Sequence, residues 1–269
     1  MNIKPSQAPI QPFNTAAADT DSLLKKLASG KRVQQAADDA AGLQIINRLT
    51  QETNAASQGI RNIYDGISLA NVAEQTLAGV SDGLAELNQL TVQAGNGMLS
   101  DIDRQALQQQ ASQLTQGIAE QLKRSNFAGQ PLFDGAQNFS FSTPGSQSTS
   151  TLNINTQDLT TELTNSGVLS IDLTDRTTLA TQQEQLKSFS AMVEQGRASF
   201  GASVNRFDSA ARSLMNNNEN MSAARSRIAD LDYAKAVSSQ VSSQIREQAS
   251  VAMQGQARIS AQQASQLLG

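Results

Sequence analysis

A long heptad pattern in the N-terminal half most constrains how this chain can fold. Between residues 43 and 91, apolar or small side chains recur at alternating steps of three and four residues. This spacing is typical of a long α-helix that buries one narrow face. At 1.5 Å of rise per residue the helix would span roughly 70–80 Å, too long for the core of a compact domain. The pattern therefore predicts an elongated rod that packs lengthwise against itself or its neighbours. The positions are Leu43, Ile46, Leu49, Thr53, Ala56, Ile60, Ile63, Ile67, Ala70, Ala73, Leu77, Val80, Leu84, Leu87 and Thr91.

Few residue types suited to catalysis are present. The chain has no His and no Cys, and aromatic residues make up 4% of it. The commonest general base, the usual zinc ligands, thiol nucleophiles and disulfides are therefore excluded. Two carboxylates or a Ser–Lys pair could still support hydrolysis, so enzymatic activity is disfavoured rather than forbidden. We expect no metal and no cofactor, and we expect burial to come from aliphatic side chains along helices.

Charge and hydropathy exclude two classes of partner. The net charge is −4 and the pI is about 4.9, with no basic run longer than Lys25-Lys26 or Lys31-Arg32. Nucleic acid is not an expected partner, because binding it needs a basic face. No run of 18 apolar residues is present, so no membrane span is expected. Residues 1–10 contain neither an apolar region nor a small-residue cleavage site, so we expect no cleavable secretory signal.

Helix signals organise the first part of the chain. Three prolines predict an irregular segment over residues 1–13. A short helix is expected over residues 14–29, with Gly30 as its C-terminal stop, and residues 31–42 form a polar connector. After the long helix, Ser100 and Asp103 resemble a capping box that opens another helix, which ends near Ser125.

The middle of the chain has a different composition. No charged residue occurs between Asp134 and Asp158, and Ser, Thr, Asn and Gln dominate. Alternating apolar residues predict short antiparallel strands in a small β region over about 136–175. The Ser/Thr-rich stretch 142–151 reads as a solvated loop, although it could also accept O-linked sugars. The alternating residues are Phe139 and Phe141, then Leu152 and Ile154, then Leu169, Ile171 and Leu173.

The helical period returns near residue 176. A second long helix is expected to run to about residue 220, with a polar break at residues 216–218, and a final amphipathic helix to cover 228–268. The fold class is therefore mainly α: an elongated, coiled-coil-like bundle of antiparallel long helices with a small β-hairpin region in the middle of the chain.

Two local features admit two interpretations each. Asp38 and Asp39 are the nearest approach to a paired-carboxylate site, but acids ahead of a helix also interact with its free N–H groups, and we favour this capping role. Four glycines lie inside the first long helix, where each costs up to about 1 kcal/mol relative to Ala. They are either neutral surface positions or sites of close helix–helix approach within an assembly, and we favour the second. These glycines are Gly59, Gly66, Gly79 and Gly83.

Several motifs together resemble bacterial flagellins, over residues 15–135 and 176–268. Any one alone would be weak, but the combination is specific. At the N-terminal side the motifs are residues 27–33 (LASGKRV), 37–42 (ADDAAG), 64–70 (YDGISLA), 90–97 (LTVQAGNG) and 127–135 (FAGQPLFDG). At the C-terminal side they are residues 226–234 (SRIADLDYA), 248–253 (QASVAM) and 265–268 (SQLL).

The resemblance implies a structural subunit that self-assembles into the bacterial flagellar filament for swimming motility. It implies that segments 1–33 and 228–269 form the inner, tube-lining domain and that 34–227 form the helical rod core. Only the short β region stands where flagellins commonly carry a variable outer domain, so a minimal form is implied. A hook–filament junction protein of the same apparatus is the alternative.

The resemblance also implies partners and a location. The subunit would be exported through the flagellar type III apparatus, with an export chaperone, to the extracellular filament, where cap and hook-associated proteins join it. Candidate subunit contacts on the terminal segments are Leu231, Val241, Ile245, Leu267 and Leu268.

The same resemblance bears on a host partner, the innate-immune flagellin receptor. Many flagellins carry LQRVRELSVQ at the segment that this receptor reads, and residues 84–93 match it here. Glu86 and Asn88 replace its two arginines, whereas Leu90 and Gln93 are retained. Weak recognition by the receptor is therefore expected, with Glu86, Leu90 and Gln93 at the contact-equivalent positions.

Overall fold

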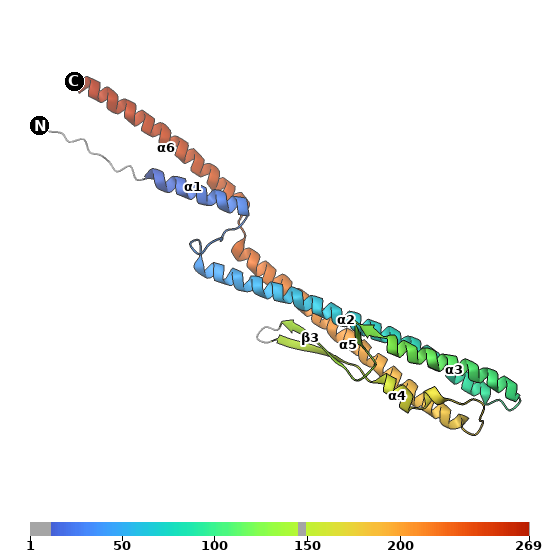
Figure 1. The fold of residues 1–269 in the computed structure, drawn as a ribbon. Helices are drawn as coiled ribbons and strands as arrows, with labels where there is room; N and C mark the ends of the chain where they lie inside the picture. The colour runs from blue at the N-terminus through green and yellow to red at the C-terminus, as the bar shows by residue number, and fades with distance from the viewer. Residues whose placement is uncertain (1–11, 145–148, 269) are drawn as a thin grey trace. The chain divides into compact units, whose positions relative to one another are not determined.

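The computed structural model describes residues 12–144 and 149–268 (Figure 1). The chain divides into two compact units. Unit 1 comprises Met1–Thr53 and Glu219–Gly269, and unit 2 comprises Asn54–Asn218. Two long helices, α2 (Ala40–Ala94) and α5 (Leu179–Ala229), contribute to both units. The predicted class, mainly α with long helices and a small β region, is confirmed.

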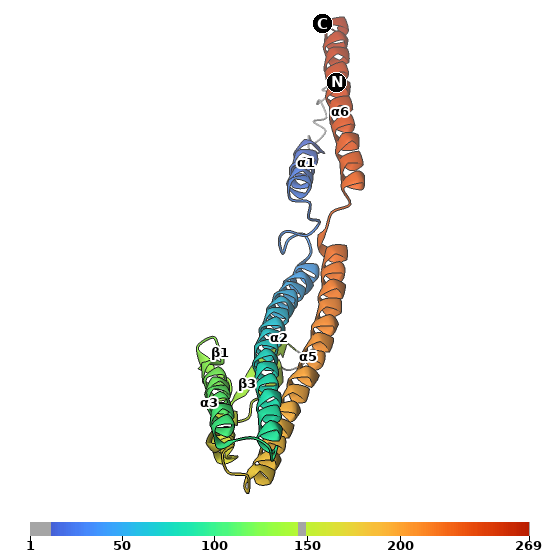
Figure 2. The ribbon, with the colours of Figure 1, turned by 90° about the vertical axis from the view of Figure 1, so that its right-hand side faces the viewer.

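The heptad pattern of α2 marks its buried face. In unit 2, α2 runs alongside α5 (Figures 1 and 2). The aliphatic side chains of α2 from Ile63 to Leu87 belong to the same buried core as those of α5, whose buried residues are spaced in the same way. The prediction of two long helices is therefore confirmed. The buried residues of α5 in this core are Leu179, Leu186, Phe189, Val193, Phe200, Phe207 and Ala211.

The predicted break in the second long helix is wrong, because α5 continues to Ala229. Asn216 and Asn217 are exposed, while the side-chain amide of Asn218 donates to Ser57 Oγ at 3.3 Å. An asparagine costs only about 0.7 kcal/mol relative to alanine in a helix, too little to end a long helix by itself.

Helix α3 (Asp101–Arg124) begins at the predicted capping box. The Ser100 hydroxyl accepts a hydrogen bond from the backbone N–H of Asp103, and the Asp103 carboxylate accepts from the N–H of Ser100. Leu107, Ala111 and Ile118 then pack against the core of unit 2.

Two small antiparallel sheets follow. Strand β1 (Asn126–Phe127) pairs with β2 (Gln130–Pro131), and β3 (Asn138–Pro144) pairs with β4 (Thr149–Asn155). The predicted hairpin is confirmed, with Phe141 opposite Leu152. The stretch expected as a loop, 142–151, instead begins and ends within β3 and β4, and its residues 145–148 lie outside the described part of the chain.

The third predicted strand is wrong. After the short helix α4 (Leu159–Asn165), this stretch forms a 3-10 turn η1 (Val168–Ser170) and an irregular segment. Ile171 and Leu173 are buried, which explains their alternation, but their backbone partner is a side chain. The Gln108 amide donates to Ile171 O at 2.9 Å and accepts from Leu173 N at 2.6 Å. The Gln108 side chain thus makes the backbone hydrogen bonds that a neighbouring strand would otherwise make.

The α2 glycines that the sequence assigned to assembly contacts instead allow close approach within unit 2. A Cβ at Gly66 would lie 2.1 Å from Cε1 of Phe207, and one at Gly59 would lie 2.3 Å from Cδ of Pro144. Gly79 and Gly83 meet Gln121 and Ile118 of α3 in the same way. Glycine is therefore most strongly favoured at Gly59 and Gly66, where the hairpin and α5 lie against α2.

Unit 1 contains α1 (Pro12–Ser29) and α6 (Tyr233–Leu268), which lie side by side (Figures 1 and 2). Helix α1 ends at Gly30, whose φ of +67° lies in the left-handed region that glycine favours, as predicted. The last helix does not begin at residue 228 as expected. Ile228 belongs to α5, and α6 begins only after Asp232, whose carboxylate accepts from Lys235 N at 3.0 Å.

Candidate assembly site

The segments that follow α1 and α5 are paired with each other in unit 1. Arg32 N donates to Ala229 O at 2.7 Å, and Leu231 N donates to Gly30 O at 2.9 Å. The Arg32 guanidinium also donates to Ile228 O, at 2.8 Å from Nη2. We call residues 30–39 together with 228–232 the joint. It connects the N-terminal and C-terminal motifs that the sequence places almost 200 residues apart.

The two adjacent acids hold the joint in different ways. Asp39 Oδ1 accepts from Gly42 N at 2.8 Å, which confirms the capping role at the start of α2. Asp38 instead accepts from the backbone N–H groups of Gln34 and Gln35, and its carboxylate lies 3.0 Å from Lys26 Nζ. The hydrogen bond from Gln34, followed by the one from Lys26, lowers the pKa of Asp38. The carboxylate therefore supports the joint at neutral pH, and this contribution is lost in acid as the pH falls through the lowered pKa.

Helix α6 buries one polar residue and exposes several apolar ones. Its buried positions are Ala236 and Gln240, whereas Val237, Val241 and Ile245 are exposed. We call Val237, Val241 and Ile245 the outer row. Val251, Met253 and Ile259, farther along α6, are exposed as well. A soluble helix normally turns its apolar stripe inward, so the exposed outer row is the candidate contact surface of this helix.

The predicted contact residues lie in three different settings. Val241 and Ile245 are 48% and 61% exposed, on the outer row. Leu231 lies in the joint and is half-buried. The side chains of Leu267 and Leu268 lie outside the described part of the structure. Their role as subunit contacts stays a prediction for all five.

Gln240 is the feature of this helix that sequence reasoning missed. Its side chain is 7% exposed, and neither its amide nitrogen nor its amide oxygen has a hydrogen-bond partner. Burying such groups without partners costs free energy. The sequence did not single out Gln240 as buried, because Gln and Ser are frequent all along α6.

Replacing this glutamine should therefore strengthen unit 1. We expect Gln240→Leu to stabilise α6 against local opening by about 1–3 kcal/mol, because the substitution removes an unpaired buried amide. Amide hydrogen exchange of the monomer, read over the first turns of α6, measures this change. Gln244→Leu is the matched control, because Gln244 is exposed one turn away and should leave exchange unaltered. Unchanged or faster exchange in Gln240→Leu would contradict the expectation.

The segment matched to the receptor motif lies on α2 in unit 2. Glu86, Asn88 and Gln93 are exposed, so a partner could reach them. Leu90 is only 8% exposed and belongs to the hydrophobic core. Its role as a receptor contact therefore stays a prediction. Packing in the core is by itself enough to explain why residue 90 is apolar.

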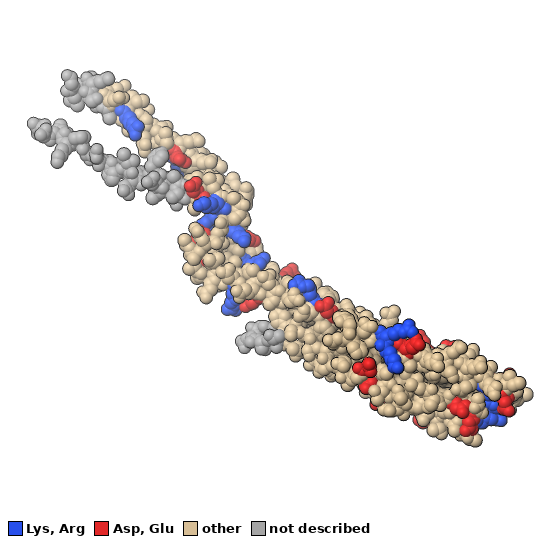
Figure 3. Space-filling view, viewed as in Figure 1, with Lys and Arg blue, Asp and Glu red and all other residues tan. Residues whose placement is uncertain are grey.

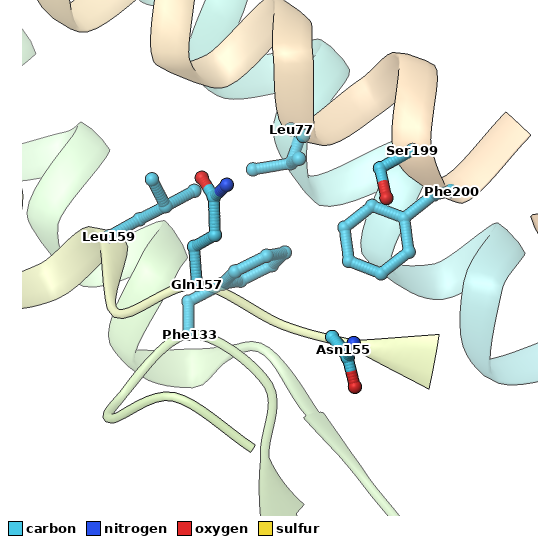
Figure 4. Close-up of a pocket in the computed structure, with 8 residues that line it drawn as sticks. Leu77, Phe133, Asn155, Gln157, Leu159, Ser199 and Phe200 are labelled. Atoms are coloured by element: carbon cyan, nitrogen blue, oxygen red, sulfur yellow. The ribbon is translucent and has the colours of Figure 1, made fainter. Parts of the chain in front are cut away.

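The small cavity between α2, α5 and the segment after β4 in unit 2 does not resemble an active site. The pocket in Figure 4 measures about 20 Å³, room for one water molecule. Phe133 and Phe200 face each other across it edge-on, with ring centroids 6.1 Å apart. None of its lining side chains is titratable. Over residues 12–144 and 149–268, no cluster of three or more acids is placed to hold a metal ion.

Over the described residues, the face shown in Figure 3 carries no extended patch of a single charge. Blue and red side chains alternate there along the described part of the chain. No helix in the described ranges is long and apolar enough to cross a membrane.

The fold defines a class: a mainly helical subunit whose first and last helices pair and whose segments after α1 and α5 meet at one joint. Comparison with known proteins assigns the family. The profile of the bacterial flagellin N-terminal helical region matches residues 5–138, and that of the C-terminal helical region matches residues 184–268. The chain belongs to the bacterial flagellin family, and it is a structural subunit of the flagellar filament.

Individual relatives agree with this assignment. A flagellin of Halalkalibacterium halodurans is 32% identical over 245 residues, which cover 91% of this chain and 90% of the relative. The flagellin of Bacillus subtilis is 32% identical over 277 residues, 91% of each chain. A flagellar filament 30.7 kDa core protein of Treponema maltophilum is 30% identical over 91% of this chain and 90% of its own length. The crystal structure of Bacillus cereus flagellin matches with a TM-score of 0.53 and 25% identity, over 61% of this chain and 94% of that one. No observation favours a hook–filament junction protein.

Proposed function

We propose that this subunit polymerises through its terminal segments, with 1–33 and 228–269 lining the inner tube of the filament and 34–227 forming the surrounding wall. The observation that supports this arrangement best is the outer row of α6, because its aliphatic side chains are exposed while a polar residue is buried behind them. A second copy of the chain is the partner that would cover the outer row.

Negative-stain microscopy after salt-induced polymerisation tests this function. Long tubular filaments are expected from the purified protein. Short rings or persistent monomers under conditions that polymerise a related flagellin would overturn it.

The remaining assignments follow from the family and are proposals for this chain. The subunit leaves the cell through the flagellar type III export apparatus, accompanied by an export chaperone and without cleavage of a signal. It acts outside the cell, where cap and hook-associated proteins join the filament that it forms. Its role is structural rather than enzymatic, in keeping with a sequence that lacks His and Cys.

Recognition by the host flagellin receptor should be weak. Glu86 places a negative charge, and Asn88 a neutral group, where many flagellins carry arginine, and both are exposed. A reversed charge at a partly desolvated contact can lower affinity by orders of magnitude. We expect low activation by the monomer in a reporter-cell assay and a strong gain from Glu86→Arg combined with Asn88→Arg.

A control with the same charge change separates a local contact from a general effect. Asn217→Arg with Glu219→Arg alters two exposed residues of α5 that have the same spacing and types. This control should not raise activation. Potent activation by the unaltered monomer, or equal gains from both double variants, would contradict the proposal.

A further inference from the structure

The turn between α2 and α3 exposes two large apolar side chains. Met98 is 93% exposed, more than any other large hydrophobic residue in the described part of the chain, and Ile102 is 78% exposed. Leu99, between them, packs against the core. We call Met98 and Ile102 the tip. Single exposed apolar residues need no explanation, but two that lie four residues apart on one turn form a projecting apolar surface.

The tip is held in place rather than left loose. The Asn96 side chain accepts from Met98 N at 3.1 Å, and Leu99 N donates to Asn96 O. The capping box of Ser100 and Asp103 fixes the next residues at the start of α3. Binding through the tip would therefore lose little conformational entropy, because its backbone is already ordered.

Unit 1 contains a partly apolar groove beside the joint. It lies between the joint, the first turns of α2 and the end of α5. Val33 and Ala229 are buried in it, and Leu43 and Ile46 are half-buried. The hydrogen bonds of Arg32 to Ala229 O and of Gln34 N to Asp38 hold its walls, so the groove exists before anything binds.

Charge distinguishes the two surfaces. The carboxylates of Asp101 and Asp103 flank Ile102 at the tip. Asp101 lies 3.4 Å from Nη2 of the largely buried Arg104, and the Arg176 guanidinium lies against Gly97. Lys31 and Arg225 line the groove, with Asp230 as its only acidic lining residue among those described, and the Ser226 hydroxyl donates to that acid. The exposed carboxylates of Asp101 and Asp103 beside the apolar projection would therefore face the cations of Lys31 and Arg225 at the rim of a partly apolar depression.

We propose that the tip of one subunit inserts into the groove of a second copy of the same chain. The proposal rests on the proposed function and adds to it a specific contact, separate from the outer row of α6. Because the two surfaces differ, the contact is heterologous, and such contacts repeat from copy to copy to give open helical polymers. Met98 and Ile102 fill the depression over Leu43 and Ile46.

Disulfide trapping tests the contact directly, because the chain has no cysteine of its own. Subunits carrying Met98→Cys are mixed with subunits carrying Ile46→Cys, polymerised and mildly oxidised. We expect a covalent dimer, of twice the 28.5 kDa chain mass, in filaments but not in the monomer pool. The control mixture pairs Met98→Cys with Leu24→Cys, which places the second thiol on an exposed position of α1, and should give no dimer.

A functional variant adds a second readout. Met98→Asp should raise the subunit concentration needed for polymerisation by about tenfold or more, since a charge would enter an apolar groove. Met98→Leu should leave it unchanged, and circular dichroism should show that both variants keep the native helix content. Filaments that form without cross-links, with Met98→Asp assembling normally, would overturn this contact while leaving the proposed function intact. Failure of the unaltered chain to polymerise would overturn both.

Discussion

Ile245→Asp should leave the subunit folded and abolish its polymerisation. Ile245 is 61% exposed on the outer row of α6, so a carboxylate there remains hydrated in the monomer. In the proposed filament a second copy covers the same position, and burying an unpaired carboxylate costs several kcal/mol. Several kcal/mol correspond to a rise of more than a hundredfold in the subunit concentration at which filaments form. Sedimentation of filaments measures this effect, with circular dichroism of the supernatant as the check on folding.

Two controls give this result its meaning. Ile245→Leu keeps an aliphatic side chain and should polymerise. Val92→Asp places the same charge at an equally exposed aliphatic position, 59% exposed on α2, and should also polymerise. If Ile245→Asp formed filaments at the normal concentration, or if Val92→Asp blocked assembly to the same degree, the outer row of α6 would not be a specific subunit contact.

Phe207→Ala should be the most damaging substitution for the fold of unit 2. The Phe207 ring is fully buried and lies edge-on to Phe141, with centroids 5.5 Å apart. It joins α5 to the hairpin and to α2 at Gly66. We expect a loss of about 3–5 kcal/mol in the free energy of unfolding, measured by urea titration followed by circular dichroism. Tyr64→Ala is the matched control, because that ring is 49% exposed and should cost far less.

The contact between Gly66 and Phe207 can be tested separately. Gly66→Ala alone should destabilise unit 2 by about 1–3 kcal/mol, because the new methyl group overlaps the ring. In the Phe207→Ala background that overlap is gone, so the same substitution should cost little or stabilise the helix. If the destabilising effects of the two substitutions were additive, the Phe207 ring would not be the reason why position 66 needs glycine.

The helices and most of their ends could be predicted from the sequence, because those signals are local. The three- and four-residue spacing in α2, the capping box at Ser100 and the stop at Gly30 each act within one or two helical turns. The same holds for the pairing of β3 with β4, which are neighbours in the chain. The combined motifs near the two ends of the chain also identified the family, because a sequence motif can be recognised without the structure.

The errors arose where a residue depends on something distant in the sequence. The alternation near Ile171 resembled a strand, but Gln108, more than 60 residues earlier, supplies its hydrogen bonds. The glycines of α2 indicated close packing, yet only the structure identified the hairpin, α3 and α5 as the elements that require it. Leu90 matched a receptor-contact motif, and only the structure shows that it packs in the core; the contact itself stays a prediction.

The candidate site divides in the same way. The sequence by itself determined that the last helix is amphipathic and named Val241 and Ile245 on it. Only the tertiary structure decided that these side chains point outward while Gln240 is buried, and that Met98 and Ile102 project from a fixed turn. The physical reason is that periodicity defines the faces of a helix, whereas the surroundings of each face depend on segments that meet only after the chain has folded.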